Sequence, residues 1–130
     1  PPSEAAKLKA DKRLLISGKV YDLLTLKPVA GARLSFVAKR RGRFSAARTG
    51  ADGTYRVRLD PSQFGYEVEF SHPRYGNLYM EEGSPPYSSR SVENRRDERD
   101  AMHSNQIVHL PFMLEGPKRA ITHDLVVSGQ

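Results

Sequence analysis

The chain of 130 residues has no cysteine. This absence excludes disulfide bonds, thiolate metal ligands and cysteine nucleophiles, although it leaves the cellular compartment open. No apolar run approaches the roughly 20 residues that a membrane-spanning helix needs. No signal-peptide pattern opens the chain either. Because the chain begins Pro1-Pro2-Ser3 without a methionine, we expect it to be a piece of a longer protein.

The motifs of the common enzyme classes are also missing. The sequence has no phosphate-binding loop and no dinucleotide fingerprint, and it lacks the G-x-S-x-G turn that exposes a nucleophilic serine. The four histidines, His72, His103, His109 and His123, show no short metal-ligand spacing. We therefore expect no catalytic residues, no bound metal and no cofactor.

Charge and length describe an ordinary small domain. One domain suits 130 residues, and the first 13 are polar enough to predict a linker or flexible arm ahead of a domain over 14–130. The net charge of +6 would favour an anionic partner. Positive residues cluster only at Lys39-Arg40-Arg41-Gly42-Arg43, however, so we interpret the charge mainly as a solvated surface and expect no nucleic-acid partner.

Residues 49–59 carry the clearest structural pattern. Asp52-Gly53 has the residue types of a tight turn and predicts a hairpin. After it, Tyr55, Val57 and Leu59 alternate with two arginines. A period of two is typical of a half-buried strand.

Similar patterns predict further strands, and Gly18 within the first of them indicates a bulge or a close backbone approach. On the strand over 66–70, Glu67 and Glu69 point outward, where they could pair with Arg56 and Arg58 across a sheet. The predicted strands cover residues 14–21, 32–39, 44–49, 55–59, 66–70, 77–80, 106–114 and 121–127. Many short strands with frequent turns favour an antiparallel β-sandwich.

Residues 81–105 interrupt this rhythm. A connection of about 25 residues exceeds the usual length between strands, so it is either functional or mobile. Ser91 has the residue type of a helix N-cap, and we expect a short charged helix over 94–99. Insertions on a rigid scaffold often carry recognition, which makes this segment a candidate partner surface.

Three stretches together resemble the carboxypeptidase regulatory-like domains. They are Ile16-Ser17-Gly18-Lys19-Val20-Tyr21-Asp22, Lys27-Pro28-Val29-Ala30-Gly31-Ala32-Arg33-Leu34 and Thr49-Gly50-Ala51-Asp52-Gly53-Thr54-Tyr55-Arg56-Val57. The resemblance implies an all-β fold, a transthyretin-like antiparallel seven-stranded β-sandwich. It also implies a non-catalytic accessory module of a larger bacterial protein that is exported or belongs to the cell envelope, located in the periplasm or outside the cell. The charged insertion over 81–105 departs from the family's short pattern.

The sequence is also compatible with two alternative functions. Intradiol dioxygenases have a similar Asp-Gly hairpin and bind iron through two tyrosines and two histidines. This chain offers Tyr75, Tyr79, Tyr87, His103 and His109, but it lacks their H-x-H strand. An anion- or carbohydrate-binding module is the other alternative, based on the basic tip over 39–43 and the tyrosines.

We therefore predict a structural or protein-interaction module. Its expected partners are other domains of the parent chain or proteins of the cell envelope, and the oligomeric state is left open. The candidate partner-binding residues lie at the basic tip and in the insertion: Lys39, Arg40, Arg41, Arg43, Tyr87, Arg95, Arg96 and Arg99.

Overall fold

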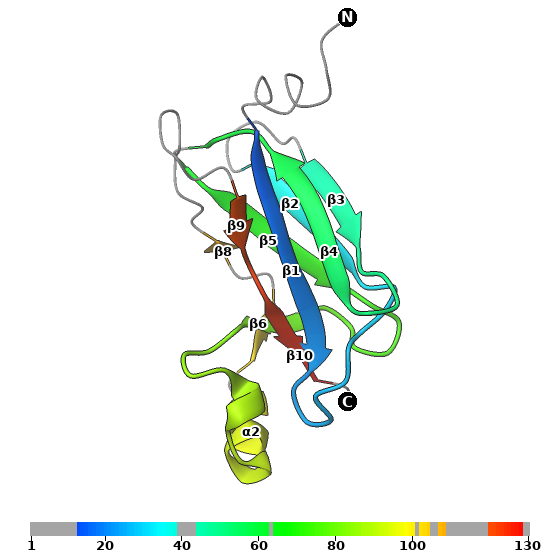
Figure 1. The fold of residues 1–130 in the computed structure, drawn as a ribbon, viewed down its shortest axis with the longest axis vertical. Helices are drawn as coiled ribbons and strands as arrows, with labels where there is room; N and C mark the ends of the chain where they lie inside the picture. The colour runs from blue at the N-terminus through cyan, green and yellow to red at the C-terminus, as the bar shows by residue number, and fades with distance from the viewer. Residues whose placement is uncertain are drawn as a thin grey trace, which may run out of the picture.

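Two β-sheets pack face to face in the computed structural model (Figure 1). The structure describes residues 13–38, 44–62, 64–100, 102–104, 107–108 and 120–128. Four of the candidate residues, Lys39, Arg40, Arg41 and Arg43, lie outside this part of the chain, as does most of the predicted arm over 1–13. None of the helices in the described ranges is long and apolar enough to cross a membrane.

The larger sheet has the strand order β4-β1-β10-β6-β7, and β9 also pairs with β1. Its members are β1 (Leu14–Asp22), β4 (Thr54–Leu59), β6 (Leu78–Glu81), β7 (His103–Ser104), β9 (Ala120–Thr122) and β10 (Leu125–Val127). The sandwich prediction is confirmed, but β9 and β10 run parallel to β1. The strand predicted over 121–127 is therefore two short strands, separated at His123 and Asp124.

The smaller sheet has the order β3-β2-β5-β8 and is antiparallel throughout. It consists of β2 (Arg33–Ala38), β3 (Phe44–Arg48), β5 (Tyr66–Ser71) and β8 (Ile107–Val108). Glu67 and Glu69 lie on β5, whereas Arg56 and Arg58 lie on β4 in the other sheet. The predicted pairing of these acids and arginines across one sheet is therefore wrong.

The main core fills the space between the two sheets. Alternate residues of each strand point into it, as the period of two predicts. Phe36 and Tyr55, from opposite sheets, approach with ring centroids 6.1 Å apart. The core also includes Leu14, Ile16, Val20, Leu34, Tyr66, Val68, Phe70, Tyr79, Leu125 and Val127, all buried.

The Asp52-Gly53 turn links the two sheets and does not form the predicted hairpin. β3 pairs with β2, and β4 pairs with β1. The backbone of Gly53 has φ +78°, and a Cβ added there would come within 2.7 Å of the Val20 carbonyl oxygen. The turn thus crosses between sheets at a point where only glycine fits.

The three family-like motifs meet at this end of the sandwich. The Val20 N–H donates to the Gly53 carbonyl at 2.8 Å, and the Val29 N–H donates to the Val20 carbonyl at 2.9 Å. The Thr49 hydroxyl donates to the Val29 carbonyl at 2.6 Å and accepts from the Ala32 N–H at 2.9 Å. The backbone groups and the Thr49 hydroxyl thus form internal hydrogen bonds that hold strands and turns together.

Gly18 marks a close backbone approach, as predicted. A Cβ at this position would overlap the carbonyl of His123, between β9 and β10. The same carbonyl accepts a hydrogen bond of 2.5 Å from the Tyr55 hydroxyl. Gly18 therefore lets the C-terminal strands lie directly against β1.

Candidate functional site

The segment between β6 and β7 forms a separate unit on the outer face of the larger sheet. We call residues 82–100 the appendage; it contains a 3-10 helix η1 (Tyr87–Ser89) and the helix α2 (Val92–Arg99). Figure 1 shows α2 beyond the end of the sandwich, next to β6 and the end of β10. The predicted helix is confirmed, and it begins two residues earlier than expected.

A second apolar cluster joins the appendage to the sheet. Tyr21, Leu23, Met80 and Val126 come from the sheet and its loops, and Tyr87 comes from η1. Tyr21, Met80 and Val126 point away from the main core because their strand neighbours point into it. Tyr87 is only 7% exposed. In this domain the Tyr87 side chain thus packs on the sheet, and its role in binding a partner stays a prediction.

Glu82 connects the first residues of the appendage to β1. Both of its carboxylate oxygens accept from the Tyr21 hydroxyl at 2.8 Å, and Oε1 also accepts from the N–H groups of Gly83 and Tyr87 at 3.1 and 3.0 Å. Burial raises the pKa of Tyr21 above its ordinary value, and the Glu82 carboxylate raises this pKa further. Tyr21 is thus held as a neutral hydrogen-bond donor.

Arg95 anchors α2. Its side chain is buried, and Nη1 donates to the carbonyls of Leu23 at 2.8 Å and Leu24 at 2.6 Å, while Nε donates to the Arg90 carbonyl at 3.4 Å. A guanidinium can satisfy several carbonyls at once because its donors are arranged in a fixed fork. Arg95, a predicted partner-binding residue, thus binds the domain's own backbone here, and its contact with a partner stays a prediction.

Arg90 and Ser91 stabilise the connection between the two helices. The Arg90 guanidinium lies 4.5 Å from the Tyr87 ring centroid and donates to the Pro85 carbonyl through Nε and Nη2. The Ser91 hydroxyl accepts from the Asn94 N–H at 3.1 Å, which confirms Ser91 as the N-cap. The appendage is thus held at both helices.

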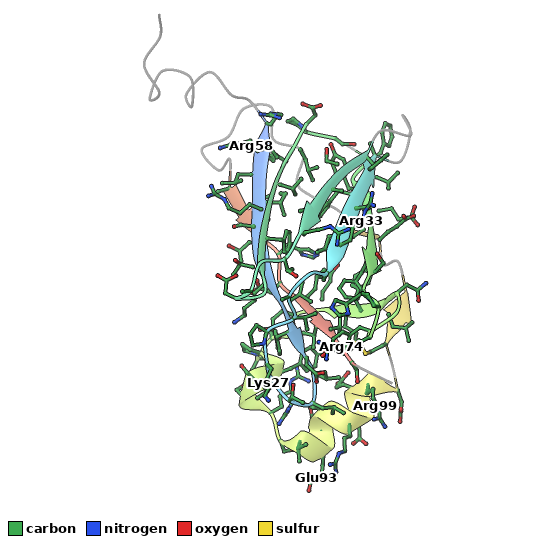
Figure 2. All side chains as sticks on the ribbon, turned by 90° about the vertical axis from the view of Figure 1, so that its right-hand side faces the viewer. Lys27, Arg33, Arg58, Arg74, Glu93 and Arg99 are labelled. Atoms are coloured by element: carbon green, nitrogen blue, oxygen red, sulfur yellow. The ribbon has the colours of Figure 1, made fainter. Side chains whose placement is uncertain are left out.

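Arg96 and Arg99 remain on the exposed side of α2. Glu93, Asn94 and Asp97 are exposed on the same helix, and Figure 2 shows Glu93 and Arg99 at the far end of the molecule. Two of the four candidates in the insertion are therefore available for contact. This surface therefore presents guanidinium groups, carboxylates and the amide of Asn94.

A shallow pocket of about 230 Å³ lies beside the appendage. It is lined by Lys19, Val20, Tyr21, Leu26, Pro28, Asp52 and Ser88. Its volume is below the roughly 300 Å³ at which ligand pockets usually begin. The Asp52 carboxylate accepts from the N–H and hydroxyl of Thr54 at 3.1 and 2.7 Å, and these bonds lower the pKa of Asp52. Asp52 thus serves the turn and is a poor general base.

The described tyrosines do not converge on one point. Tyr79 belongs to the main core and donates to the Val68 carbonyl at 2.7 Å, whereas Tyr87 packs on the opposite face of the same sheet. The Tyr75 hydroxyl donates to the Asp22 carboxylate at 2.9 Å. Tyr79 and Tyr87 therefore cannot bind one iron ion together. The side chains of His103 and His109 lie outside the described part.

The two histidines whose side chains the structure describes, His72 and His123, are also far from a metal-ligand arrangement. His72 Nε2 is 3.0 Å from the Ala30 carbonyl oxygen, and Nδ1 accepts from the Arg74 N–H at 3.0 Å. Burial lowers the pKa of His123, against the opposing effect of Glu81 and Asp124. Within the described ranges, no three His, Asp or Glu side chains are grouped so that they could hold a metal ion.

Several residues that build this region have no recognisable pattern in the sequence. Glu82 and Met80 follow an ordinary strand, and nothing in the spacing of the arginines separates the buried Arg95 from the exposed Arg96. The weak signal was Tyr87, an aromatic residue in an otherwise polar stretch. It indicates that the insertion has an apolar contact, but the contact itself depends on the outward face of β1, β6 and β10.

The two-sheet architecture and the internal bonding of its turns define the class of an all-β sandwich domain. The sequence model of the family described as carboxypeptidase regulatory-like domain matches residues 15–82, and the chain belongs to this family. The match contains the three motifs that meet around Gly53. It ends at Glu82, where the appendage begins.

The fold also resembles one solved enzyme domain. The structure is the dioxygenase domain of a dioxygenase carbohydrate-binding protein fusion from the cellulolytic bacterium Streptomyces sp. SirexAA-E, with a TM-score of 0.52 and 16% sequence identity over 91% of this chain and 80% of that chain. At this identity the likeness shows the fold alone. No curated protein sequence matches the chain.

Proposed function

We propose that this domain is a non-catalytic module of a larger exported or cell-envelope protein, and that it binds a neighbouring domain or partner protein through the exposed side of α2. The observation that carries this proposal is the fixed appendage. Arg95, Tyr21 and Glu82 hold it to the sheet through buried or partly buried bonds. A surface that is held in place before binding loses less conformational entropy when a partner is bound.

The non-catalytic part of the proposal is supported by how the polar residues are used. The Thr49 hydroxyl donates to one backbone carbonyl and accepts from one backbone N–H. The Asp22 carboxylate accepts from two backbone N–H groups and from the Tyr75 hydroxyl. Tyr21 is neutral and bonded to Glu82. These groups hold turns together, whereas an active site needs a nucleophile, acid or base aimed at an accessible pocket. The envelope location rests on family membership alone, because domains of this family are found as accessory modules of larger, mostly exported proteins.

Iron content and ring cleavage test the non-catalytic part. The purified chain, refolded with excess ferrous or ferric iron and then dialysed, is expected to retain less than stoichiometric iron and to leave catechol uncleaved. The Streptomyces dioxygenase domain under the same conditions is the positive control. Stoichiometric iron together with catechol turnover would show that the domain is an enzyme.

Charge reversal on α2 tests the binding part. In the full-length parent protein, the double variant R96E/R99E is expected to lose cross-links between α2 and its partner surface. The control variant R56E/R74E makes the same charge change elsewhere on the exposed surface and is expected to keep these cross-links. Cross-linking followed by mass spectrometry gives the readout, and thermal unfolding confirms that both variants fold. Equal loss in the two variants, or no cross-link from α2 in the unchanged protein, would contradict the proposal.

A further inference from the structure

The free edge of the smaller sheet has the features of a second binding surface. β3 pairs with β2 on one side and is the last strand of its sheet. None of the described residues pairs with its other side. β3 contains no proline, no glycine and no bulge in its register with β2. Such an edge can accept another strand unless the protein blocks it.

The register shows which backbone groups point outward. The Thr49 N–H donates to the Ala32 carbonyl at 3.0 Å, so Thr49 and every second residue before it bond toward β2. Hydrogen bonding alternates along an antiparallel pair. The N–H and C=O groups of Phe44, Ala46 and Arg48 therefore lie on the free edge, ready to pair with an added strand.

The side chains of the same three residues form the outer face of β3. All three are exposed, and the Phe44 side chain is 61% exposed, the largest value among the large apolar residues described. Ala46 lies opposite Ser35, so the middle of the face is flat and small. An aromatic residue at one end and a cation at the other give the edge a direction.

Arg48 lies directly opposite Arg33. Like charges at such positions repel each other, and neither forms an ion pair with another described residue; Arg48 only donates to the Gly31 carbonyl at 3.5 Å. Figure 2 shows Arg33 on the smaller sheet, away from Glu93 and Arg99 on α2. This surface is therefore separate from the appendage.

We propose that β3 binds an extended, acidic peptide segment of a partner protein as an additional antiparallel strand. The peptide would place a carboxylate across from Arg48, a small residue across from Ala46 and an aromatic or aliphatic residue across from Phe44. Backbone bonds would give affinity and these side chains would give specificity, as in other cases of strand addition. The carboxylate would relieve the repulsion between Arg33 and Arg48.

A second copy of this chain fits the edge less well. Each copy has a net charge of +6, and pairing two β3 strands would bring two Arg33–Arg48 pairs to one sheet. An acidic peptide has the complementary charge. A homodimer through β3 is therefore the competing outcome of the experiment.

The probe is a fluorescein-labelled peptide with the core Glu-Val-Thr-Val-Tyr, which puts its glutamate across from Arg48 when it runs antiparallel. The control peptide has lysine in place of glutamate. Fluorescence anisotropy at low and moderate salt gives the dissociation constants. We expect the glutamate peptide to bind more tightly, by about fivefold, as one cross-strand ion pair predicts.

Variants of the chain separate backbone pairing from simple charge attraction. A46P removes an N–H that points to the free edge and leaves the bonds to β2 in place, so binding should fall by about tenfold or more, because proline cannot donate to the added strand. R48E should weaken the glutamate peptide and strengthen the lysine peptide. R56E, on β4 in the other sheet, should leave both dissociation constants within about twofold, since rim charges contribute little.

Two measurements keep the test independent of the folding of A46P. The backbone N–H of the peptide's threonine faces β3, so N-methylation of this residue should abolish binding to the unchanged chain. The backbone N–H of each valine faces away from β3, so N-methylation of a valine should not abolish binding. Hydrogen exchange at Phe44, Ala46 and Arg48 should slow in the complex. Equal effects of both methylations, equal weakening by R56E and R48E, or a peptide-free dimer with protected β3 amides would overturn the proposal.

Discussion

Arg95 brings a positive charge into the contact between the appendage and the larger sheet. Its partners are three backbone carbonyls, those of Leu23, Leu24 and Arg90. Carbonyls left without a donor in a buried contact lose the hydrogen bonds that they would make with water. Arg95 therefore couples the position of α2 to the loop that follows β1.

Replacing Arg95 should destabilise the appendage. We expect R95M to reduce the free energy of unfolding by about 1–3 kcal/mol, because the Leu23 and Leu24 carbonyls lose their donors. R96M, one residue along and exposed, should change it by less than about 0.5 kcal/mol. Urea unfolding measures both variants. Equal stability of R95M and R96M would show that Arg95 is not the anchor.

Gly18 makes a second single-residue prediction. G18A should cost at least about 1–3 kcal/mol, the usual range for overpacking, because the new methyl group would overlap the His123 carbonyl. G50A is the matched control, since a Cβ there would only touch the Asp52 carboxylate at 3.4 Å. Thermal unfolding compares the two. A stable G18A would mean that β9 and β10 do not lie against β1 as described.

At the scale of elements, α2 depends on a local signal and a distant contact. Ser91 caps the helix from within the sequence, while Arg95 and Tyr87 connect it to the sheet. α2 has only eight residues, and isolated helices of that length are marginal in water. The tertiary contact therefore supplies most of the stability of the helix.

Removing the Ser91 cap tests how much of the stability of α2 is local. S91A should destabilise α2 by about 1 kcal/mol, because the Asn94 N–H loses its acceptor. Hydrogen exchange in the first turn of α2 should become faster, while exchange in β1 and β4 stays the same. S89A is the control in η1, where the hydroxyl donates to the Pro86 carbonyl and caps no α-helix. Faster exchange throughout the sandwich would show that α2 is part of the main cooperative unit.

At the scale of the whole molecule, His123 couples folding to pH. Burial lowers the pKa of its imidazole below the ordinary value of 6.5, and Nε2 has no hydrogen-bond partner among the described residues. The unfolded chain therefore binds a proton at His123 at a higher pH than the folded chain does. Stability from this residue is complete above about pH 6.5 and is lost as the pH falls toward the lower folded pKa.

H123Q should remove this part of the pH dependence. Between pH 7.5 and 5.5 the unchanged chain should lose more stability than the variant, since glutamine does not titrate. Urea unfolding at several pH values measures the difference in the free energy of unfolding. H72Q serves as the control histidine substitution, because both ring nitrogens of His72 lie within hydrogen-bond distance of backbone groups, unlike Nε2 of His123. Parallel pH profiles for H123Q and the unchanged chain would contradict the prediction.

The sequence by itself determined the strands, their inward residues, the Ser91 cap and the family. These depend on local properties: a period of two, a glycine where a Cβ has no room, and a serine that bonds three residues ahead. They are readable along the chain because each involves neighbours in sequence. The match over residues 15–82 rests on the same local motifs.

Only the tertiary structure decided which strands share a sheet and which polar residues are exposed. The Asp52-Gly53 turn could close a hairpin or cross between sheets, and the pairing of β3 with β2 and of β4 with β1 selects the crossing. Arg95 and Arg96 are chemically the same, but α2 lies against the loop that follows β1. Arg95 therefore meets the Leu23 and Leu24 carbonyls, whereas Arg96 meets solvent. Arg95 is buried and Arg96 is exposed because of contacts between residues about 70 positions apart in the sequence, which no local pattern encodes.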